Sequence, residues 1–71
     1  MLNNLSILRK KAGYSQEVFA GLLNVTRQTI ISLERGRYNP SILLAFKISR
    51  LLNKTIEEIF IPEEGDLKWL S

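Results

Sequence analysis

Four side chains with strong hydrogen-bonding groups lie along a short stretch near the middle of the chain: Arg27, Gln28, Ser32 and Arg35. Planar guanidinium and amide groups near the start of a helix fit the edges of guanine and adenine in a major groove. Arg27 fits either guanine or a phosphate, Gln28 fits adenine, and Ser32 is a third candidate for contact with a base. These residue types suit recognition of a nucleic acid through hydrogen bonds, but the helical pattern alone does not distinguish a DNA-binding face from any other polar face.

Three neighbouring residues extend this candidate surface. Thr26 and Thr29 suit contacts with phosphate, because hydroxyl groups and backbone amides at a helix start are common phosphate donors. Ile31 is less expected on a polar face. It either touches a thymine methyl group or packs half-buried beside the helix, and the sequence favours neither.

The chain offers little for catalysis. Its 71 residues contain no cysteine and no histidine, which removes disulfides, the commonest metal ligand and the commonest general base. The adjacent pairs Glu57–Glu58 and Glu63–Glu64 would point about 100° apart on a helix and would not converge. No glycine-rich phosphate loop is present. We therefore expect one domain that is not an enzyme, with no metal, no cofactor and no small-molecule effector.

Charge is distributed unevenly within the net value of +3. Residues 1–56 hold nine basic side chains against two acidic ones, whereas residues 57–71 hold one against five. A basic body suits a polyanion such as DNA, although ordinary solvated surface charge explains it as well. No apolar run reaches the ~18 residues of a membrane span, and the start lacks the layout of a signal peptide, so we expect a cytoplasmic protein.

Two short helices joined by a tight turn are predicted to position the polar residues. Ser15 and Thr26 are suited to cap these helices, and Asn24 and Gly36 to end them. Apolar residues three to four apart give each helix an inward face: Phe19, Ala20 and Leu23, then Ile30 and Leu33.

Three further helices are predicted around this pair. The first starts at Asn3 or Asn4 and runs to about Lys11, and another lies between Ser41 and Asn53. The capping box Thr55–Glu58 opens a short last helix. The inward residues predicted for these helices are Leu5, Leu8, Ala12, Ile42, Ala45, Ile48, Leu52, Ile56, Ile59 and Phe60.

Two apolar features are left over. Val18 and Leu22 form either an exposed patch or a surface that packs under the C-terminal tail, and packing is the preferred interpretation. In the tail, apolar segments flank a turn at Gly65 and Asp66, which predicts a small hairpin or a strand of a dimer. An isolated hairpin is marginal in water, so it would lie on the body or pair with another subunit. The alternative is a frayed tail with Trp69 loosely packed.

A long pattern surrounds the polar stretch. Its members are Leu8, Arg9, Gly13, Tyr14, Ser15, Gln16, Phe19, Ala20, Leu23, Val25, Thr26, Arg27, Gln28, Thr29, Ile30, Leu33, Glu34 and Gly36. This pattern resembles that of the lambda-repressor-like helix-turn-helix proteins of bacteria and phage, including the Cro and xenobiotic-response-element types. The resemblance continues through Asn39, Pro40 and Ser41 to Phe60, and so covers most of the chain.

The resemblance implies an all-α, compact five-helix DNA-binding domain over residues 1–61, followed by an extension over residues 62–71 that is a candidate dimerisation element. It implies a sequence-specific transcription regulator, most often a repressor, that binds double-stranded DNA as a homodimer on a pseudo-palindromic operator. The helix from about Thr26 to Arg35 would enter the major groove. The alternative is an antitoxin-like interaction module whose main partner is another protein.

The resemblance also implies roles for particular residues. Arg9 and Glu34 would form a structural ion pair that ties the first helix to the end of the third. The residues assigned to DNA phosphate are Gln16, Thr26, Thr29, Arg35, Arg37 and Tyr38, and those assigned to bases are Arg27, Gln28, Ser32 and Ile31. Relatives commonly dimerise through the C-terminal region, where this chain has Phe60, Ile61, Leu67, Trp69 and Leu70.

Overall fold

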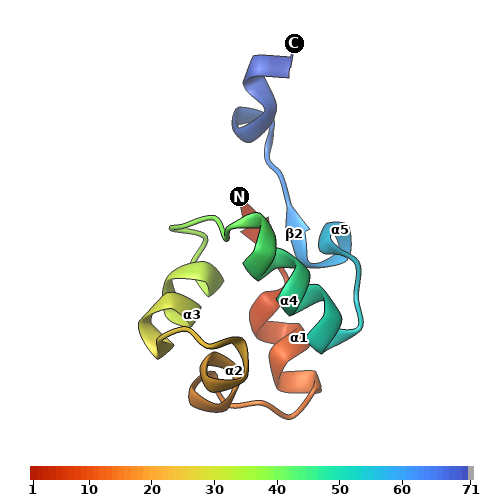
Figure 1. Ribbon diagram of the computed structural model, residues 1–71. Helices are drawn as coiled ribbons and strands as arrows, with labels where there is room; N and C mark the ends of the chain where they lie inside the picture. Colours follow the sequence, from red (N-terminus) through yellow and green to blue (C-terminus); the bar gives the residue numbers. More distant parts are fainter. Residues whose placement is uncertain (71) are drawn as a thin grey trace.

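Five α-helices, a short strand pair and a 3₁₀ helix make up the part of the chain that the computed structural model describes, which is residues 1–70, with backbone alone for residues 68–70. In chain order the elements are β1 (Leu2–Asn3), α1 (Leu5–Lys11), α2 (Gln16–Leu23), α3 (Arg27–Glu34), α4 (Ile42–Leu52), α5 (Ile56–Ile59), β2 (Phe60–Ile61) and the 3₁₀ helix η1 (Glu64–Leu70). Helices α1 to α5 form the body, and η1 projects from it beyond β2 (Figure 1). The predicted five-helix fold is confirmed.

Short-range capping explains where most helices begin and end. At α2, α3, α4 and α5 a hydroxyl side chain accepts a hydrogen bond from the backbone N–H three residues further on, and the capping residues are Ser15, Thr26, Ser41 and Thr55. Asn24 and Asn53 end α2 and α4 with φ of 58° and 54°. Asparagine tolerates this left-handed conformation better than most residues, which makes these helix ends readable from the sequence.

The core lies between the helices and receives side chains from all five of them. Its fully buried members are Leu5, Phe19, Ile30, Leu33, Ile48 and Ile59. Burial of one such side chain contributes about 1.5–3 kcal/mol relative to exposure, so these six side chains account for much of the driving force of folding. The inward faces predicted for α2 and α3 are confirmed.

Two residues predicted to face inward lie on the surface instead. Ala12 follows the last residue of α1 as its C-cap and is exposed. Ile42, in the first turn of α4, is 78% exposed, and Leu44 is buried. The five apolar residues 42–46 are too many for one helix face, so their spacing did not determine which of them would be buried.

The prediction of a C-terminal hairpin is wrong. Strand β2 pairs antiparallel with β1 at the start of the chain, with Asn3 opposite Phe60. Pro62 follows β2 and has no N–H to continue a ladder. Beyond it, the Asp66 carboxylate accepts a hydrogen bond from the backbone N–H of Glu63 at 2.8 Å. This contact closes the first turn of η1, so the chain continues as a 3₁₀ helix rather than as a second strand.

Val18 and Leu22 are 52% and 57% exposed on α2, so the expected packing under the tail is also wrong. Helix α2 and η1 lie at opposite ends of the molecule (Figure 1). The tail instead approaches the N-terminal residue, whose ammonium group lies 3.4 Å from the Glu63 carboxylate. Across the described residues, no helix has the length and apolar character needed to cross a membrane.

Candidate nucleic-acid interface

Helix α3 presents the polar residues singled out in the sequence. Thr26 starts it, with its hydroxyl accepting from the Thr29 backbone N–H at 3.2 Å and lying 3.0 Å from the Thr29 hydroxyl. Ile30 and Leu33 hold the inner face of α3 against the core, while Arg27 and Gln28 are exposed in its first turn. The helix therefore offers its N-terminal turn to solvent, where backbone N–H groups and the helix dipole favour anions.

A buried ion pair holds the other end of α3. The Arg9 Nε donates to Glu34 Oε2 at 2.6 Å, and Arg9 Nη2 donates to the other carboxylate oxygen at 3.3 Å. The remaining guanidinium nitrogen donates to the Tyr14 carbonyl at 2.8 Å. Arg9 is only 6% exposed, so the pair implied by the resemblance is present and shielded from water. It joins α1, the α1–α2 turn and the last residue of α3.

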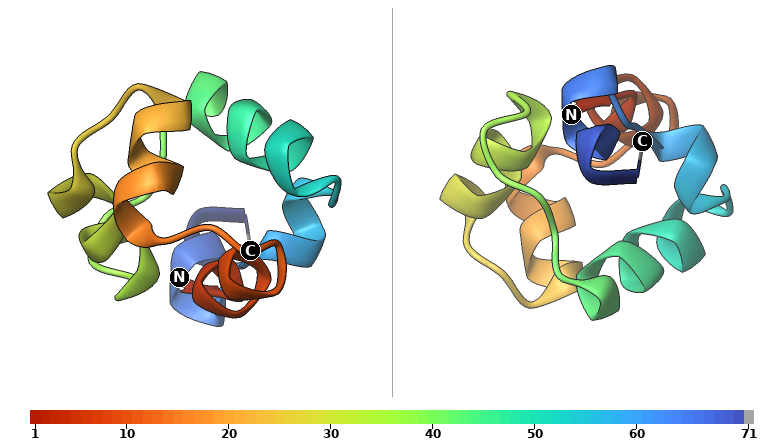
Figure 2. Two further views of the ribbon diagram at one scale, coloured as in Figure 1. Left: turned by 90° about the horizontal axis from the view of Figure 1, so that it is seen from below. Right: turned by 90° about the horizontal axis from the view of Figure 1, so that it is seen from above.

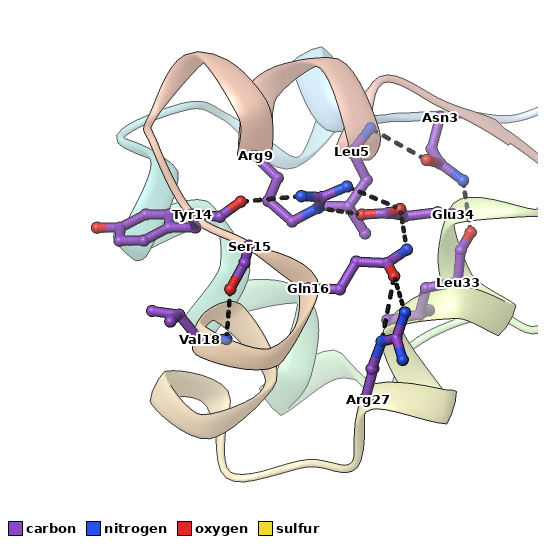
Figure 3. Close-up of polar contacts among 10 residues, drawn as sticks. All are labelled: Asn3, Leu5, Arg9, Tyr14, Ser15, Gln16, Val18, Arg27, Leu33 and Glu34. Carbon is purple, nitrogen blue, oxygen red and sulfur yellow. Dashed lines mark hydrogen bonds and ion pairs between the residues drawn. The ribbon is translucent and has the colours of Figure 1, made fainter.

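Gln16 extends this network to the exposed end of α3 (Figure 3). Its Nε2 donates to Glu34 Oε1 at 3.1 Å, and its Oε1 accepts from Arg27 Nη2 at 3.3 Å and from Arg27 Nε at 3.4 Å. Arg27 is thus held against the first turn of α2. An amide nitrogen carries two donors, so Gln16 retains one N–H beyond its bond to Glu34.

The residues assigned to bases fall into two neighbouring groups. Gln28 and Ser32 line a shallow hollow of about 330 Å³ together with three residues assigned to phosphate, namely Thr26, Thr29 and Tyr38. Arg27 lies instead in an adjoining hollow of about 630 Å³ with Arg9, Gln16, Glu34 and Lys10 among its lining residues. Ile31 is half-buried on the flank of α3.

The loop after α3 carries the remaining cations of this surface. Arg35 and Arg37 are exposed there, and Tyr38 is 46% exposed. Gly36 has a φ of +70°, which most side chains rarely adopt. The backbone N–H of Arg37 bonds back to the Ser32 carbonyl at 3.1 Å, so the loop is folded against the end of α3.

The residues assigned to a dimer interface are partly exposed, partly buried and partly outside the described side chains. Ile61 and Leu67 are exposed. Phe60 is only 6% exposed and belongs to the core, because its strand position opposite Asn3 turns its side chain into the body, so its assignment to an open interface is corrected. Trp69 and Leu70 fall outside the side chains that the structure describes.

The sequence analysis missed a larger apolar surface on α4. Ile42, Leu43 and Phe46 are 78%, 65% and 50% exposed. A hollow of about 450 Å³ beside them is lined mainly by apolar residues, among them Ile42, Phe46 and Leu67. The available signal was the uninterrupted apolar run over residues 42–46, which exceeds what one inward helix face can bury. Among the described residues, no three metal-ligating side chains of the Asp, Glu, His or Cys type cluster together.

The arrangement of α2 and α3, two short helices joined by a tight turn, defines a helix-turn-helix domain. A helix-turn-helix family matches residues 5–59. The chain belongs to this lambda-repressor-like helix-turn-helix family.

Relatives and a solved structure agree with this assignment. An HTH-type transcriptional regulator of Methanothermobacter thermautotrophicus is 52% identical over 61 residues, covering 84% of this chain and 88% of the relative. The control protein C.MunI of a Mycoplasma species is 41% identical over 65 residues, covering 90% and 88%. The crystal structure of the restriction-modification controller protein C.AhdI from Aeromonas hydrophila matches with a TM-score of 0.69 at 34% identity, covering 79% of this chain and 81% of that one.

Proposed function

We propose that the chain is a sequence-specific DNA-binding transcription regulator, most simply a repressor, whose α3 enters the major groove. One observation carries this proposal. The first turn of α3 is exposed and polar, and its Arg27 is held by Gln16, which is itself held by the buried Arg9–Glu34 pair. A surface that is exposed yet fixed in geometry suits the reading of base edges, because a bidentate contact requires a defined orientation.

Within this proposal the polar residues divide by role. Gln28 contacts adenine, Arg27 contacts guanine, and Ser32 and Ile31 contribute from the same helix face. Each bidentate contact is worth about 1–3 kcal/mol of discrimination against the wrong base. Phosphate contacts come from residues around them, which are Gln16, Thr26, Thr29, Arg35, Arg37 and Tyr38. The hollow shared by Gln28, Ser32 and Tyr38 supports a joint footprint of this kind.

The proposed active species is a homodimer on a pseudo-palindromic operator. The exposed apolar side chains of α4, with Leu67 lining the same hollow as Ile42 and Phe46, support association with a second copy, and Ile61 is a further exposed apolar residue. Residues 1–61 would then form the DNA-binding domain, and residues 62–71 would contribute to the interface as an extension. The two half-sites would lie about one helical turn apart, ~34–36 Å.

Repression needs no chemistry, because occupation of a promoter is sufficient. The names of two relatives, a control protein and a restriction-modification controller, support a role in the control of gene expression. Basic side chains would make the affinity fall steeply with salt, since each neutralised phosphate releases counterions.

A second candidate is an antitoxin-like module whose main partner is another protein. The observation that favours it is the exposure of Val18 and Leu22. Leu22 also lines a hollow of about 710 Å³ with Leu43 and Phe46, which extends the apolar surface from α4 onto α2. A stable complex with a second, co-encoded protein, formed in the absence of DNA, would favour this function.

Selection of DNA from a random pool tests the proposal. We expect a pseudo-palindrome to be enriched, with binding that weakens from about 50 to 200 mM salt. The Gln28→Ala variant should lose discrimination at one base pair in each half-site, while Lys54→Ala, at an exposed position between α4 and α5, should keep it. Recovery of only sequence-blind, salt-sensitive binding would reject a sequence-specific regulator.

A further inference from the structure

One side chain links the end of α3 directly to the N-terminal strand. Asn3 Nδ2 donates to the backbone carbonyl of Leu33 at 2.8 Å, and Asn3 Oδ1 accepts from the backbone N–H of Leu5 at 3.0 Å (Figure 3). The Leu33 carbonyl belongs to the last turn of α3, whose carbonyls have no partner further along the helix. The same oxygen also accepts from the Gly36 N–H at 3.0 Å. Asn3 therefore completes and fixes this helix end.

The backbone of Asn3 connects to the C-terminal side of the molecule. Asn3 lies opposite Phe60 in the β1–β2 ladder, and the next residue, Asn4, donates its backbone N–H to the Ile59 carbonyl at 2.8 Å. Strand β2 is the last element before the extension that begins at Pro62. One residue thus contacts both the end of the candidate recognition helix and the base of the candidate dimer element.

The covalent route between these two regions is much longer. It runs from α3 through the loop of residues 35–41, then α4 and α5, before it reaches β2. The N-terminal segment also packs tightly on the start of that loop, because a Cβ added at Gly36 would lie 2.8 Å from the Met1 carbonyl oxygen. In both views of Figure 2, α3 and α4 lie on different sides of the molecule. The N-terminal ammonium group lies 3.5 Å from the carboxylate of Asp66 in η1.

We propose that Asn3 is a positioning residue that sets α3 relative to the C-terminal side of the molecule and thereby sets the distance between the two recognition helices of a dimer. The inference rests on the proposed function, since it requires DNA binding by a dimer. In a two-fold dimer, a shift of α3 relative to the dimer interface occurs in both subunits, so it changes the distance between the two recognition helices. Two recognition helices must meet major grooves ~34–36 Å apart, so a small displacement changes the fit to the operator.

Asn3 has a second role that must be separated from positioning, because its Oδ1 accepts a hydrogen bond from the backbone N–H of Leu5, the first residue of α1. The Asn3→Asp substitution separates the two roles. It keeps an acceptor for the Leu5 N–H, removes the donor to the Leu33 carbonyl, and places a negative charge near the C-terminal end of α3, where the helix dipole disfavours it. Asn4→Ala is the control, because the Asn4 Nδ2 donates to the Glu58 carbonyl at 3.0 Å, so among the described residues its side-chain hydrogen bond goes to α5 and not to α3.

The experiment compares the affinities of both variants for a half-site and for full operators in which base pairs are added or removed between the half-sites. We expect Asn3→Asp to bind the full operator of natural spacing about tenfold more weakly, the change expected from loss of roughly one hydrogen bond, while half-site affinity changes less than about twofold. The affinity of Asn3→Asp should also depend less on the number of base pairs between the half-sites. Asn4→Ala should keep the natural preference even if it unfolds more easily.

Hydrogen exchange at the Gly36 amide provides a readout that does not involve DNA. Exchange should be faster in Asn3→Asp, by about tenfold, and unchanged in Asn4→Ala. Unchanged exchange together with an unchanged spacing preference would overturn the positioning role, and so would an equal loss of affinity for half-sites and full operators. If the unmodified protein binds no palindrome, the proposed function fails. Faster exchange at Gly36 in Asn3→Asp would then show only that Asn3 stabilises the end of α3. Without a dimer on DNA there would be no role in half-site spacing, so the inference would be overturned as well.

Discussion

Helices α3 and α4 begin and pack in similar ways, but the exposed face of α3 is polar and that of α4 is apolar. Each begins at a hydroxyl cap, Thr26 or Ser41, and each buries apolar side chains in the same core. The outer face of α3 carries Arg27 and Gln28 in its first turn. The outer face of α4 carries large apolar side chains, Ile42, Leu43 and Phe46. The fold has therefore used two similar helices to make one polar and one apolar surface.

The difference indicates what each surface is suited to meet. Hydrogen-bonding groups that are held in place while exposed suit a hydrated, charged partner such as DNA. Large apolar groups exposed together are unfavourable in water and suit a dry contact with protein. The supporting contacts differ as well, since the ion pair of Arg9 with Glu34 holds the end of α3 in addition to the core that both helices share.

The largest expected effect comes from breaking the support of α3. Arg9→Ala leaves the Glu34 carboxylate without its buried partner, which should lower the free energy of unfolding by about 3–5 kcal/mol. Urea denaturation measures this change. Lys10→Ala, at an exposed neighbouring position, should change it by less than about 0.5 kcal/mol. A loss below about 1 kcal/mol for Arg9→Ala would mean that the ion pair does not hold the helix end.

The next effect tests the apolar face of α4. Phe46→Glu should raise the dissociation constant of the dimer at least about 30-fold, because a large apolar contact is replaced by a charge that must be desolvated. Analytical ultracentrifugation measures it. The monomer should keep its circular dichroism, since half of this side chain is already exposed. Lys47→Ala on the same helix is the control, and equal self-association of both variants would place the dimer contact elsewhere.

A smaller effect sharpens the account of the α3 surface. Arg37→Ala should weaken binding to all DNA sequences alike and reduce the slope of log affinity against log salt by about one, as expected for one lost phosphate contact. Titrations at several salt concentrations measure the slope. If Arg37→Ala weakened binding only to DNA with particular base pairs, Arg37 would be assigned to base contact instead of phosphate contact.

The smallest effect concerns the capping box that leads into the C-terminal side. Hydrogen bonds from Thr55, chiefly from its backbone N–H, hold the pKa of the Glu58 carboxyl below its usual value. A lowered pKa in the folded state means that this contribution is present above the unfolded pKa of 4.5 and is lost as the pH falls through the folded value. Unfolding measured down to about pH 3 should therefore show a shallower pH dependence in Glu58→Gln than in the unmodified chain. Identical pH profiles would mean that the capping box contributes no pH-dependent stability.

The sequence predicted best those features whose causes are local. Ser15 and Thr26 stand directly before helices that they cap, and Asn24 ends α2 through its own backbone conformation. The inward faces of α2 and α3 followed from the three-to-four spacing of Phe19 and Leu23 and of Ile30 and Leu33. The polar set on α3 could be located from residue types, but its interpretation as a DNA surface came from the resemblance.

Features that depend on distant partners could not be predicted in the same way. The tail segment looked like one arm of a hairpin, yet β2 pairs with β1, whose Asn3 is 57 positions earlier than Phe60 in the sequence. The role of Asn3 at the end of α3 gave no local signal either, because its partner Leu33 is 30 residues away. The exposure of Ile42 could not be predicted, because it lies in an unbroken apolar run at the start of α4. Such a run contains no polar residues to show which side of the helix faces the solvent.

In the proposed assembly, α3 reads DNA while the apolar face of α4 holds a second copy. Its most direct test is the binding of the unmodified protein and of Phe46→Glu to one selected half-site and to the full operator. We predict equal half-site affinities for the two proteins, and cooperative binding to the full operator by the unmodified protein alone. Equally tight, cooperative binding of the full operator by Phe46→Glu would contradict the account.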